Sequence, residues 1–237
     1  MTSALRTCFS ALLALDAVAA TVSGTVELVD SLDPAVRRHR DYSGVAVWLE
    51  PLNSSPPAIR PRTVRMIQKQ KRFTPHVLAI PVGTTVDFPN LDPIFHNAFS
   101  NFSGQPFDVG LYPPGTSQKV LFRREGVVRV FCNIHPTMSA VIVVVKTPYV
   151  TVSALDGTYS FESVEPGNYR LRVFHERTTG ETLLALERTL AVGDSPLTVP
   201  PLKISESGYV LVPHKNKHGK DYPPLVEDQP MYPGRKP

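Results

Sequence analysis

Short runs in which apolar and polar residues alternate cover most of the chain, and a period of two residues is typical of half-buried β-strands. Two such runs, residues 22–30 and 43–50, lie near the N-terminus with a polar loop between them. In the middle of the chain, "VLAIPVG" and "TTVDF" predict two strands separated at Gly83, and "SAVIVVVK" predicts a buried strand. The segment "KVLFRREGVVRVFC" predicts a hairpin that turns at Glu125 and Gly126.

The pattern becomes more regular after Pro148. Residues 149–176 alternate between apolar and polar positions around turns of the Asp-Gly and Pro-Gly type, and "LERTLAV" and "LTVPPLKI" predict two further strands. Residues 97–118 are predicted to be mostly loop, because Gly, Pro and Ser are frequent there. No segment predicts a helix longer than a turn or two, so the fold class predicted is all-β.

Composition narrows the classes of function. Hydrophobic residues make up 42% of the chain, which is enough for a buried core, and the 24 prolines favour turns and strands over helices. The net charge is only +4 and no long run of Lys or Arg occurs, which argues against nucleic acid as a partner. The short basic segment "QKQKRF" is expected to be a solvated strand face. Outside the N-terminus, no stretch is long and apolar enough to span a membrane.

The two ends of the chain differ from its centre. Residues 1–20 combine Arg6, an apolar run and the small residues "AVAA", which is the pattern of a secretory signal peptide. The alternative is a buried or frayed N-terminal helix. Residues 207–237 are rich in Pro and Lys and predict an extended, solvated tail. The expected location is therefore periplasmic or otherwise exported, and loss of the signal would remove Cys8.

Export would leave Cys132 as the one cysteine, and an unpaired exported thiol is a liability unless something such as a metal holds it. This cysteine lies in "FCNIHPTM", residues 131–138, which also contains His135 and Met138. A thiolate, an imidazole and a thioether suit copper better than magnesium or calcium, and they are too few for the usual tetrahedral zinc site. His96, which lies 36 positions earlier (132 − 96), is the candidate for a second imidazole. Two His and one Cys with a weak axial Met form a blue-copper ligand set.

Other interpretations of these residues stay open. A Cys–His pair can be a protease dyad, although both residues would lie on one loop with no helix to lower the pKa of the thiol. Cys132 can also be a buried core thiol, and Met138 a side chain that fills a gap in the core. None of the seven histidines forms a His-x-His pair, which argues against a multicopper oxidase or a nitrite reductase within one chain. The remaining histidines are expected to be structural at a strand start (His76), at the surface (His39, His175) or in the solvated tail (His214, His218).

The region from 62 to 147 resembles the cupredoxins, especially those of the amicyanin and plastocyanin types. The segment "VGTTVDFPN" is similar to the family's Gly-x-x-Val-x-Phe-x-Asn stretch. The aromatic residue before the Cys, the ligand loop and the first-ligand motif match at Phe131, Cys132, His135, Pro136, Met138, His96 and Asn97. The resemblance implies a Greek-key sandwich that holds one copper ion per chain. The ligands implied are His96, Cys132, His135 and Met138.

The segments on either side resemble a second family, the carboxypeptidase regulatory-like (transthyretin-like) β-sandwiches. The matching positions, in order, are Gly24, Val26, Val47, Leu49, Asp156, Gly157, Pro166, Gly167, Tyr169, Leu171 and Val173. The resemblance implies that the copper domain is inserted into the second sandwich. The predicted organisation is a signal peptide (1–20), a first part of the sandwich (21–61), the copper domain (62–147), a second part (148–206) and the tail (207–237). The alternative is a cupredoxin with an extra N-terminal hairpin and a separate C-terminal sandwich.

The first resemblance implies an exported, mononuclear type 1 copper protein that carries electrons, is not an enzyme and works with a redox partner protein. The alternatives are a protein that stores, delivers or senses copper, and a structural module with a relic site. In the family, the loop histidine reaches the surface through an apolar patch. His135 is therefore expected at the surface, next to Ile134 and Pro136, as the route by which the electron leaves.

Overall fold

The computed structural model describes residues 19–101, 104–210 and 214–222. Residues 1–18 of the predicted signal peptide and the end of the predicted tail, from residue 223, lie outside the described residues. Among the helices in the described part of the chain, none is long and apolar enough to cross a membrane.

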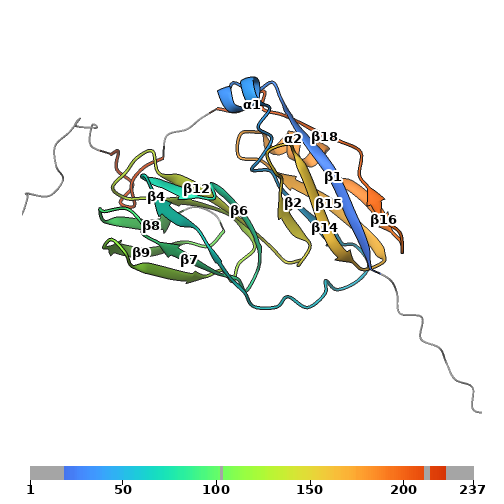
Figure 1. The fold of residues 1–237 in the computed structure, drawn as a ribbon, viewed down its shortest axis with the longest axis horizontal. Helices are drawn as coiled ribbons and strands as arrows, with labels where there is room; N and C mark the ends of the chain where they lie inside the picture. Colours follow the sequence, from blue (N-terminus) through green and yellow to red (C-terminus); the bar gives the residue numbers. More distant parts are fainter. Residues whose placement is uncertain (1–18, 102–103, 211–213, 223–237) are drawn as a thin grey trace, which may run out of the picture.

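Two β-sandwiches lie side by side in the molecule (Figure 1). We call the one formed by residues 20–51 and 150–205 the outer sandwich, and the one formed by residues 63–145 the inner sandwich. The all-β fold class predicted from the sequence is confirmed.

The outer sandwich consists of two four-stranded sheets. In one sheet the order is β14-β1-β17, with β18 also paired to β1, and in the other it is β13-β2-β15-β16. The strands are β1 (Ala20–Val29), β2 (Ala46–Pro51), β13 (Val150–Val152), β14 (Thr158–Val164), β15 (Gly167–Phe174), β16 (Arg188–Val192), β17 (Leu197–Thr198) and β18 (Leu202–Ser205).

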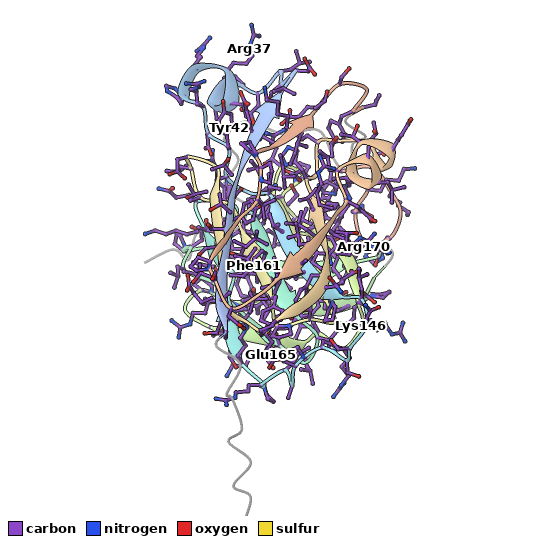
Figure 2. The ribbon with its side chains drawn as sticks, turned by 90° about the vertical axis from the view of Figure 1, so that its right-hand side faces the viewer. Arg37, Tyr42, Lys146, Phe161, Glu165 and Arg170 are labelled. Carbon is purple, nitrogen blue, oxygen red and sulfur yellow. The ribbon has the colours of Figure 1, made fainter. Side chains whose placement is uncertain are left out.

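Strand β1 shows why these segments form a sandwich. Its residues alternate between buried and half-buried positions, so one face packs inward and meets residues such as Leu49 and Leu171 of the opposite sheet. It runs antiparallel to β14 and parallel to β17 and β18, and β2 runs antiparallel to β13 and β15. Both N-terminal strands therefore pair with strands from the C-terminal part of the chain, as the implied insertion requires. Figure 2 views this sandwich from its outer side, with Phe161 inside and Glu165 and Arg170 at the margin.

The inner sandwich has a three-stranded and a five-stranded sheet, with a small hairpin beside them. The orders are β10-β7-β3, β6-β12-β11-β8-β9 and β4-β5. The strands are β3 (Thr63–Arg65), β4 (Ile67–Lys69), β5 (Arg72–Thr74), β6 (Val77–Pro81), β7 (Thr85–Pro89), β8 (His96–Ser100), β9 (Phe107–Tyr112), β10 (Ser117–Leu121), β11 (Gly126–Phe131) and β12 (Ser139–Val145).

Strand β12 explains the continuous apolar run in "SAVIVVV". Ala140, Ile142 and Val144 belong to the core of the inner sandwich, whereas Val141 and Val143 on the other face belong to an apolar cluster shared with the outer sandwich. A strand buried on both faces has no polar alternation, because neither face meets water. The prediction of a buried strand here is confirmed.

Two predictions for the inner sandwich are wrong. Residues 119–132 do not form a hairpin, because β10 pairs with β7 while β11 pairs with β12 and β8 in the other sheet. The chain crosses between the sheets at the fully buried Phe122, whose N–H donates to the Thr84 carbonyl (2.9 Å). Residues 97–118, predicted as mostly loop, contain most of β8 and all of β9, which pair with a shift of register between Asn97 and Phe99. The shift of register and the many polar residues of this segment interrupt the alternation of apolar and polar positions from which strands are predicted.

Two helices of six residues each are found among the described residues, and neither is long, as predicted for this part of the chain. Helix α1 (Pro34–His39) begins after Asp33, whose carboxylate accepts a hydrogen bond from the Ala35 N–H (2.8 Å). Helix α2 (Gly180–Ala185) begins after Thr179, whose hydroxyl accepts one from the Thr182 N–H (3.2 Å).

The sandwiches also meet through polar contacts. The Nε2 of His76, which comes just before β6, lies 2.7 Å from a carboxylate oxygen of Glu176 in the outer sandwich, so its predicted structural role is confirmed.

The prediction that His175 lies at the surface is wrong, since the residue is only 3% exposed and its Nε2 lies 2.9 Å from a carboxylate oxygen of Glu206. Glu206 also pairs with Arg177 (3.0 Å). This network joins residues far apart in the sequence, so local pattern cannot show it.

The division of the chain into an interrupted outer domain and an inserted domain at 62–147 stays a prediction. The two chain segments that flank the inner sandwich are adjacent, because the Leu49 N–H donates to the Tyr149 carbonyl (3.0 Å).

We expect a chain that lacks residues 53–147, joined by a short Gly-Ser linker, to unfold cooperatively in urea and to give a β-type circular dichroism spectrum. Trp48→Thr is included because the deletion uncovers that ring. The same chain with Leu171→Asp in the core is the unfolded control, and a deletion chain that behaves like this control contradicts the prediction.

Candidate metal centre

The segment that contains Cys132, His135 and Met138 is a loop closed by the pairing of two strands. Strands β11 and β12 are antiparallel neighbours, and Phe131 is paired with Ser139, so the residues between them form one connection. Within it, the Cys132 N–H donates to the Met138 carbonyl (3.1 Å) and the Met138 N–H donates to the His135 carbonyl (3.0 Å). This ligand loop, residues 132–138, therefore has a fixed backbone shape.

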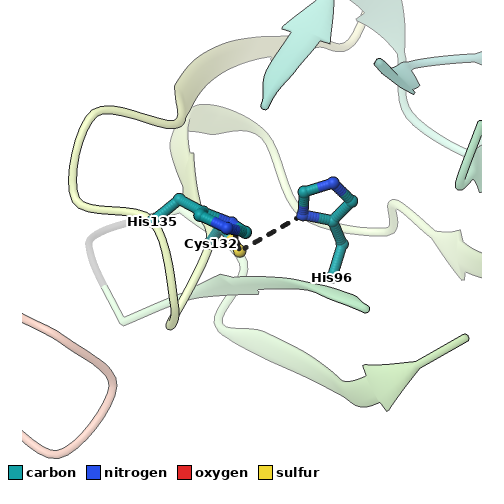
Figure 3. A group of neighbouring side chains, drawn as sticks. All are labelled: His96, Cys132 and His135. Carbon is teal, nitrogen blue, oxygen red and sulfur yellow. Dashed lines mark hydrogen bonds between the residues drawn. The ribbon is translucent and has the colours of Figure 1, made fainter. Parts of the chain in front are cut away.

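His96 reaches the same place from a different strand. It is the first residue of β8, which pairs with β11 at Phe99 and Phe131, and it is completely buried. Its Nδ1 lies 3.9 Å from the Sγ of Cys132, and the Nδ1 of His135 lies 3.6 Å from the same sulfur (Figure 3). The ligating atoms of these three residues all lie within 4.8 Å of one another. The structure thus brings together three of the four residues predicted as ligands.

Met138, the fourth predicted ligand, ends the loop. Its side chain is fully buried and belongs to the same apolar cluster as Cys132. The Cys132 N–H donates to the Met138 carbonyl. This hydrogen bond holds the first and the last residue of the loop opposite each other.

A buried carboxylate orients the ring of His96. Its Nε2 lies 2.8 Å from an Oδ of Asp92, and a carboxylate only accepts, so Nε2 carries the proton and the lone pair of Nδ1 faces Cys132. Burial alone would raise the pKa of Asp92, but hydrogen bonds from the Lys71 N–H, His96 and the Gln70 N–H outweigh it and lower the pKa. Histidines that bind metals commonly donate their second ring nitrogen to a carboxylate in this way.

His135 is kept neutral by its surroundings. Burial, together with the charge of Lys71, lowers the pKa of His135 to about 4. At neutral pH its ring therefore has a lone pair to offer to a metal ion. Its Nε2 is buried and has no hydrogen-bond partner in the described part of the chain.

The prediction that His135 lies at the surface is wrong. Only 6% of the residue is exposed. Residues 214–222, which were predicted to form part of a solvated tail, contact the ligand loop: Nε2 of His214 donates to the Pro136 carbonyl (2.7 Å), and the Tyr222 hydroxyl donates to the Cys132 carbonyl (2.9 Å). No short-range pattern in the sequence signals such a contact.

Asn97, next to His96, joins the two parts of the site. Its amide nitrogen donates to Asp108 (2.8 Å) and to the Gly110 carbonyl (2.9 Å), both in β9. Its Oδ1 accepts from the Asn133 N–H (3.3 Å) in the ligand loop. The strand that carries His96 and the loop that carries Cys132 are therefore held together directly.

Three residues that support the site, Asp92, His214 and Tyr222, were not predicted from the sequence. Asp92 precedes His96 by four positions in "NLDPIFH", a Pro-containing turn that brings the carboxylate back to the ring, and this spacing is a usable signal. The two tail residues follow the loop by more than 70 positions and show no such signal.

Comparison with known proteins gives partial matches. No family model matches the chain, and no curated protein matches it. Among solved structures, a purple cupredoxin from Nitrosopumilus maritimus is 29% identical over 34% of this chain and 97% of its own, with a TM-score of 0.31. A reduced amicyanin variant is 19% identical over 35% of this chain and 81% of its own, with a TM-score of 0.33. A copper-containing nitrite reductase from Thermus scotoductus is 29% identical over 50% of this chain and 28% of its own, with a TM-score of 0.34. Because each match is partial, the function of this chain has to be argued from its own side chains.

The orientation of His96 by Asp92 predicts a measurable effect on metal affinity. We expect Asp92→Asn to weaken binding of Co²⁺ by about 10- to 100-fold, because the amide holds no charge and orients the imidazole less strongly. The measurement is titration of the metal-free protein with Co²⁺, followed by thiolate-to-cobalt absorption. Asp194→Asn, at an exposed position in the outer sandwich, is the matched control. Equal affinities for the two variants would contradict a role for Asp92.

Proposed function

We propose that this chain is a mononuclear type 1 copper protein that transfers electrons. The observation that carries the proposal is the buried group of His96, Cys132 and His135, with all three ligating atoms within 4.8 Å. Met138 is proposed as the weak axial ligand, because it ends the same loop and is buried in the same cluster. One thiolate, two neutral imidazoles and a thioether fit copper, and one copper ion per chain is expected.

Other metals fit this donor set less well. Magnesium and calcium take oxygen ligands, and the three grouped residues offer only nitrogen and sulfur. Structural zinc usually takes four strong nitrogen or sulfur ligands, whereas a thioether is a weak fourth.

Each side chain has a role in electron transfer. A copper ion bound here would alternate between Cu(I) and Cu(II). The Cys132 thiolate provides covalent overlap for the electron, and the imidazoles of His96 and His135 suit both oxidation states. The ligand loop and Asp92 hold these groups in place, so the ligands move little when the charge of the site changes.

Burial of the ligands argues for electron transfer rather than catalysis. His96 and Cys132 are completely buried, and His135 is nearly so. A catalytic metal site keeps one position open to a substrate, and electron transfer needs no such access. We therefore propose that the chain is not an enzyme, and that it exchanges electrons with a partner protein whose identity is unknown.

The burial of His135 also favours a second candidate, copper storage or delivery. A carrier of the predicted type would expose its loop histidine, whereas this residue is only 6% exposed. A protein that retains or hands on copper has no need for an exposed histidine edge. The two candidates differ in how readily the reduced form releases its metal.

Location and the role of the outer sandwich complete the proposal. The N-terminal pattern supports export to the periplasm or beyond, where an unpaired Cys132 would be protected by its metal. The outer sandwich is proposed to be a regulatory-like module that supports the copper domain and carries no catalytic group.

The first prediction for this function concerns colour and stoichiometry. Protein loaded with Cu²⁺ should bind one ion per chain and absorb intensely in the visible range by thiolate-to-copper charge transfer. Cys132→Ser should abolish that band, because an alcohol does not replace a thiolate, whereas Cys8→Ser should leave it unchanged. Metal analysis that finds only zinc, after refolding with both metals present, would overturn the copper assignment.

A second prediction separates electron transfer from copper handling. The loaded protein is reduced with ascorbate and reoxidised with ferricyanide through repeated cycles, in the presence of a chelator specific for Cu(I). An electron carrier should regain its full visible band after each cycle and keep its copper, because the ligands stay fixed. Transfer of copper to the chelator within the first reduced period would instead favour storage or delivery.

A further inference from the structure

A single side chain of the C-terminal segment contacts both the ligand loop and the residue that precedes it. The ring of His214 stacks on Phe131, with ring centroids 3.9 Å apart and an interplanar angle of 23°. Its Nε2 donates to the carbonyl of Pro136 (2.7 Å). His214 therefore touches the residue before Cys132 and the residue after His135.

Two more residues of the segment bond to the same loop. The Tyr222 hydroxyl donates to the Cys132 carbonyl (2.9 Å), and the Lys217 N–H donates to the side-chain oxygen of Asn133 (3.0 Å). Tyr222 also packs against His214, with its hydroxyl 3.4 Å from the Nδ1 of that ring. Burial raises the pKa of Tyr222 to about 12, so the phenol keeps its proton and remains a donor.

The segment is also attached to the sheet beside the loop. The ammonium of Lys217 lies 2.8 Å from the carboxylate of Asp108 in β9. The backbone carbonyl of Lys217 accepts a hydrogen bond from the side-chain amide of Asn101 (3.1 Å). Asn216 closes a turn within the segment by accepting from the Gly219 N–H (2.9 Å). Because one part is tied to the sheet and another to the loop, the segment resists movement of the loop away from the sheet.

We propose that residues 214–222 form a clamp on the ligand loop, in which His214 and Tyr222 are positioning residues that hold Cys132 and His135 in place and slow the opening of the metal centre. The identity of the metal ion rests on the proposed function, but the clamp acts on the loop with or without the ion. The ligands lie on one short loop, so a brief opening of that loop would expose Cys132 and release a bound ion. Each hydrogen bond removed from the clamp should raise the population of the open form about fivefold.

The test uses the full chain in its metal-free form, with Cys8→Ser so that Cys132 is the one thiol. The rate at which Cys132 reacts with the disulfide reagent DTNB reports the open population, because the thiol is completely buried when the loop is closed. We expect about fivefold faster reaction for Tyr222→Phe and for His214→Ala, and a larger increase for the double variant. His218→Ala is the matched control, since that histidine lies in the same segment and its side chain is exposed. His214→Gln, which keeps a donor at this position, should restore part of the protection.

The same variants are unfolded in urea to separate local opening from loss of global stability. Unchanged midpoints with faster labelling support the clamp. Equal labelling rates in the parent and the double variant would overturn the clamp. An increase in labelling rate that is fully explained by a lower urea midpoint would overturn it as well. In protein loaded with Co²⁺, the clamp variants should also release the ion to EDTA faster than the His218→Ala control. Absence of a thiolate-to-copper band in every chain, including the parent, would overturn the copper function and leave the labelling result intact.

Discussion

The pairing of Phe131 with Ser139 is the contact on which the candidate metal centre depends. It sets the register of β11 and β12, and so the length and shape of the loop between them. A slip of one residue would turn every side chain of one strand to the opposite face, which would move Cys132 out of the core. Successive side chains of β12 point into two different apolar clusters: Ile142 packs in the core of the inner sandwich, and Val143 packs in the cluster shared with the outer sandwich. A slip of one residue would exchange these environments, so the packing stabilises the register.

Two parts of the inner sandwich and the C-terminal segment support the residues of that site. The turn between β4 and β5 supplies two backbone N–H groups to Asp92, which in turn fixes His96. Asn97 joins β8 and β9 to the loop, and residues 214–222 contact it from outside. A polar group buried without a partner is costly, so these hydrogen bonds both stabilise the fold and define the positions of the donor atoms. The protein's own hydrogen bonds therefore fix the positions of these side chains.

Sequence patterns predicted the parts of this structure that depend on local order. Alternation predicted the outer strands and the all-β class, and the spacing of Cys132 and His135 with an upstream His96 predicted a group that the structure brings together. The failures concern long-range contacts. Strand β10 has the same local pattern whether it pairs with β7 or with β11, and only the burial of Phe122 between the sheets decides. His175 was placed at the surface because its partner Glu206 is distant in the chain. His135 was placed there because the resemblance implied an exposed loop histidine, and the residue is buried.

The nested arrangement of strands has a consequence for the order of folding during synthesis. Strand β1 is made first, but Val26 pairs with Leu202 and Gly24 pairs with Tyr159. All strands of the inner sandwich leave the ribosome before β14, so that sandwich has its complete core while β1 still lacks its partners. Contacts of such long sequence separation form slowly, since closing the intervening loop costs entropy. An inner sandwich that folds early shortens that loop, because it holds Arg62 beside Thr85 (2.9 Å) and Val145 beside Val82 (2.8 Å), so its two ends stay near each other. Strand β1 is therefore made early and finds its partners late.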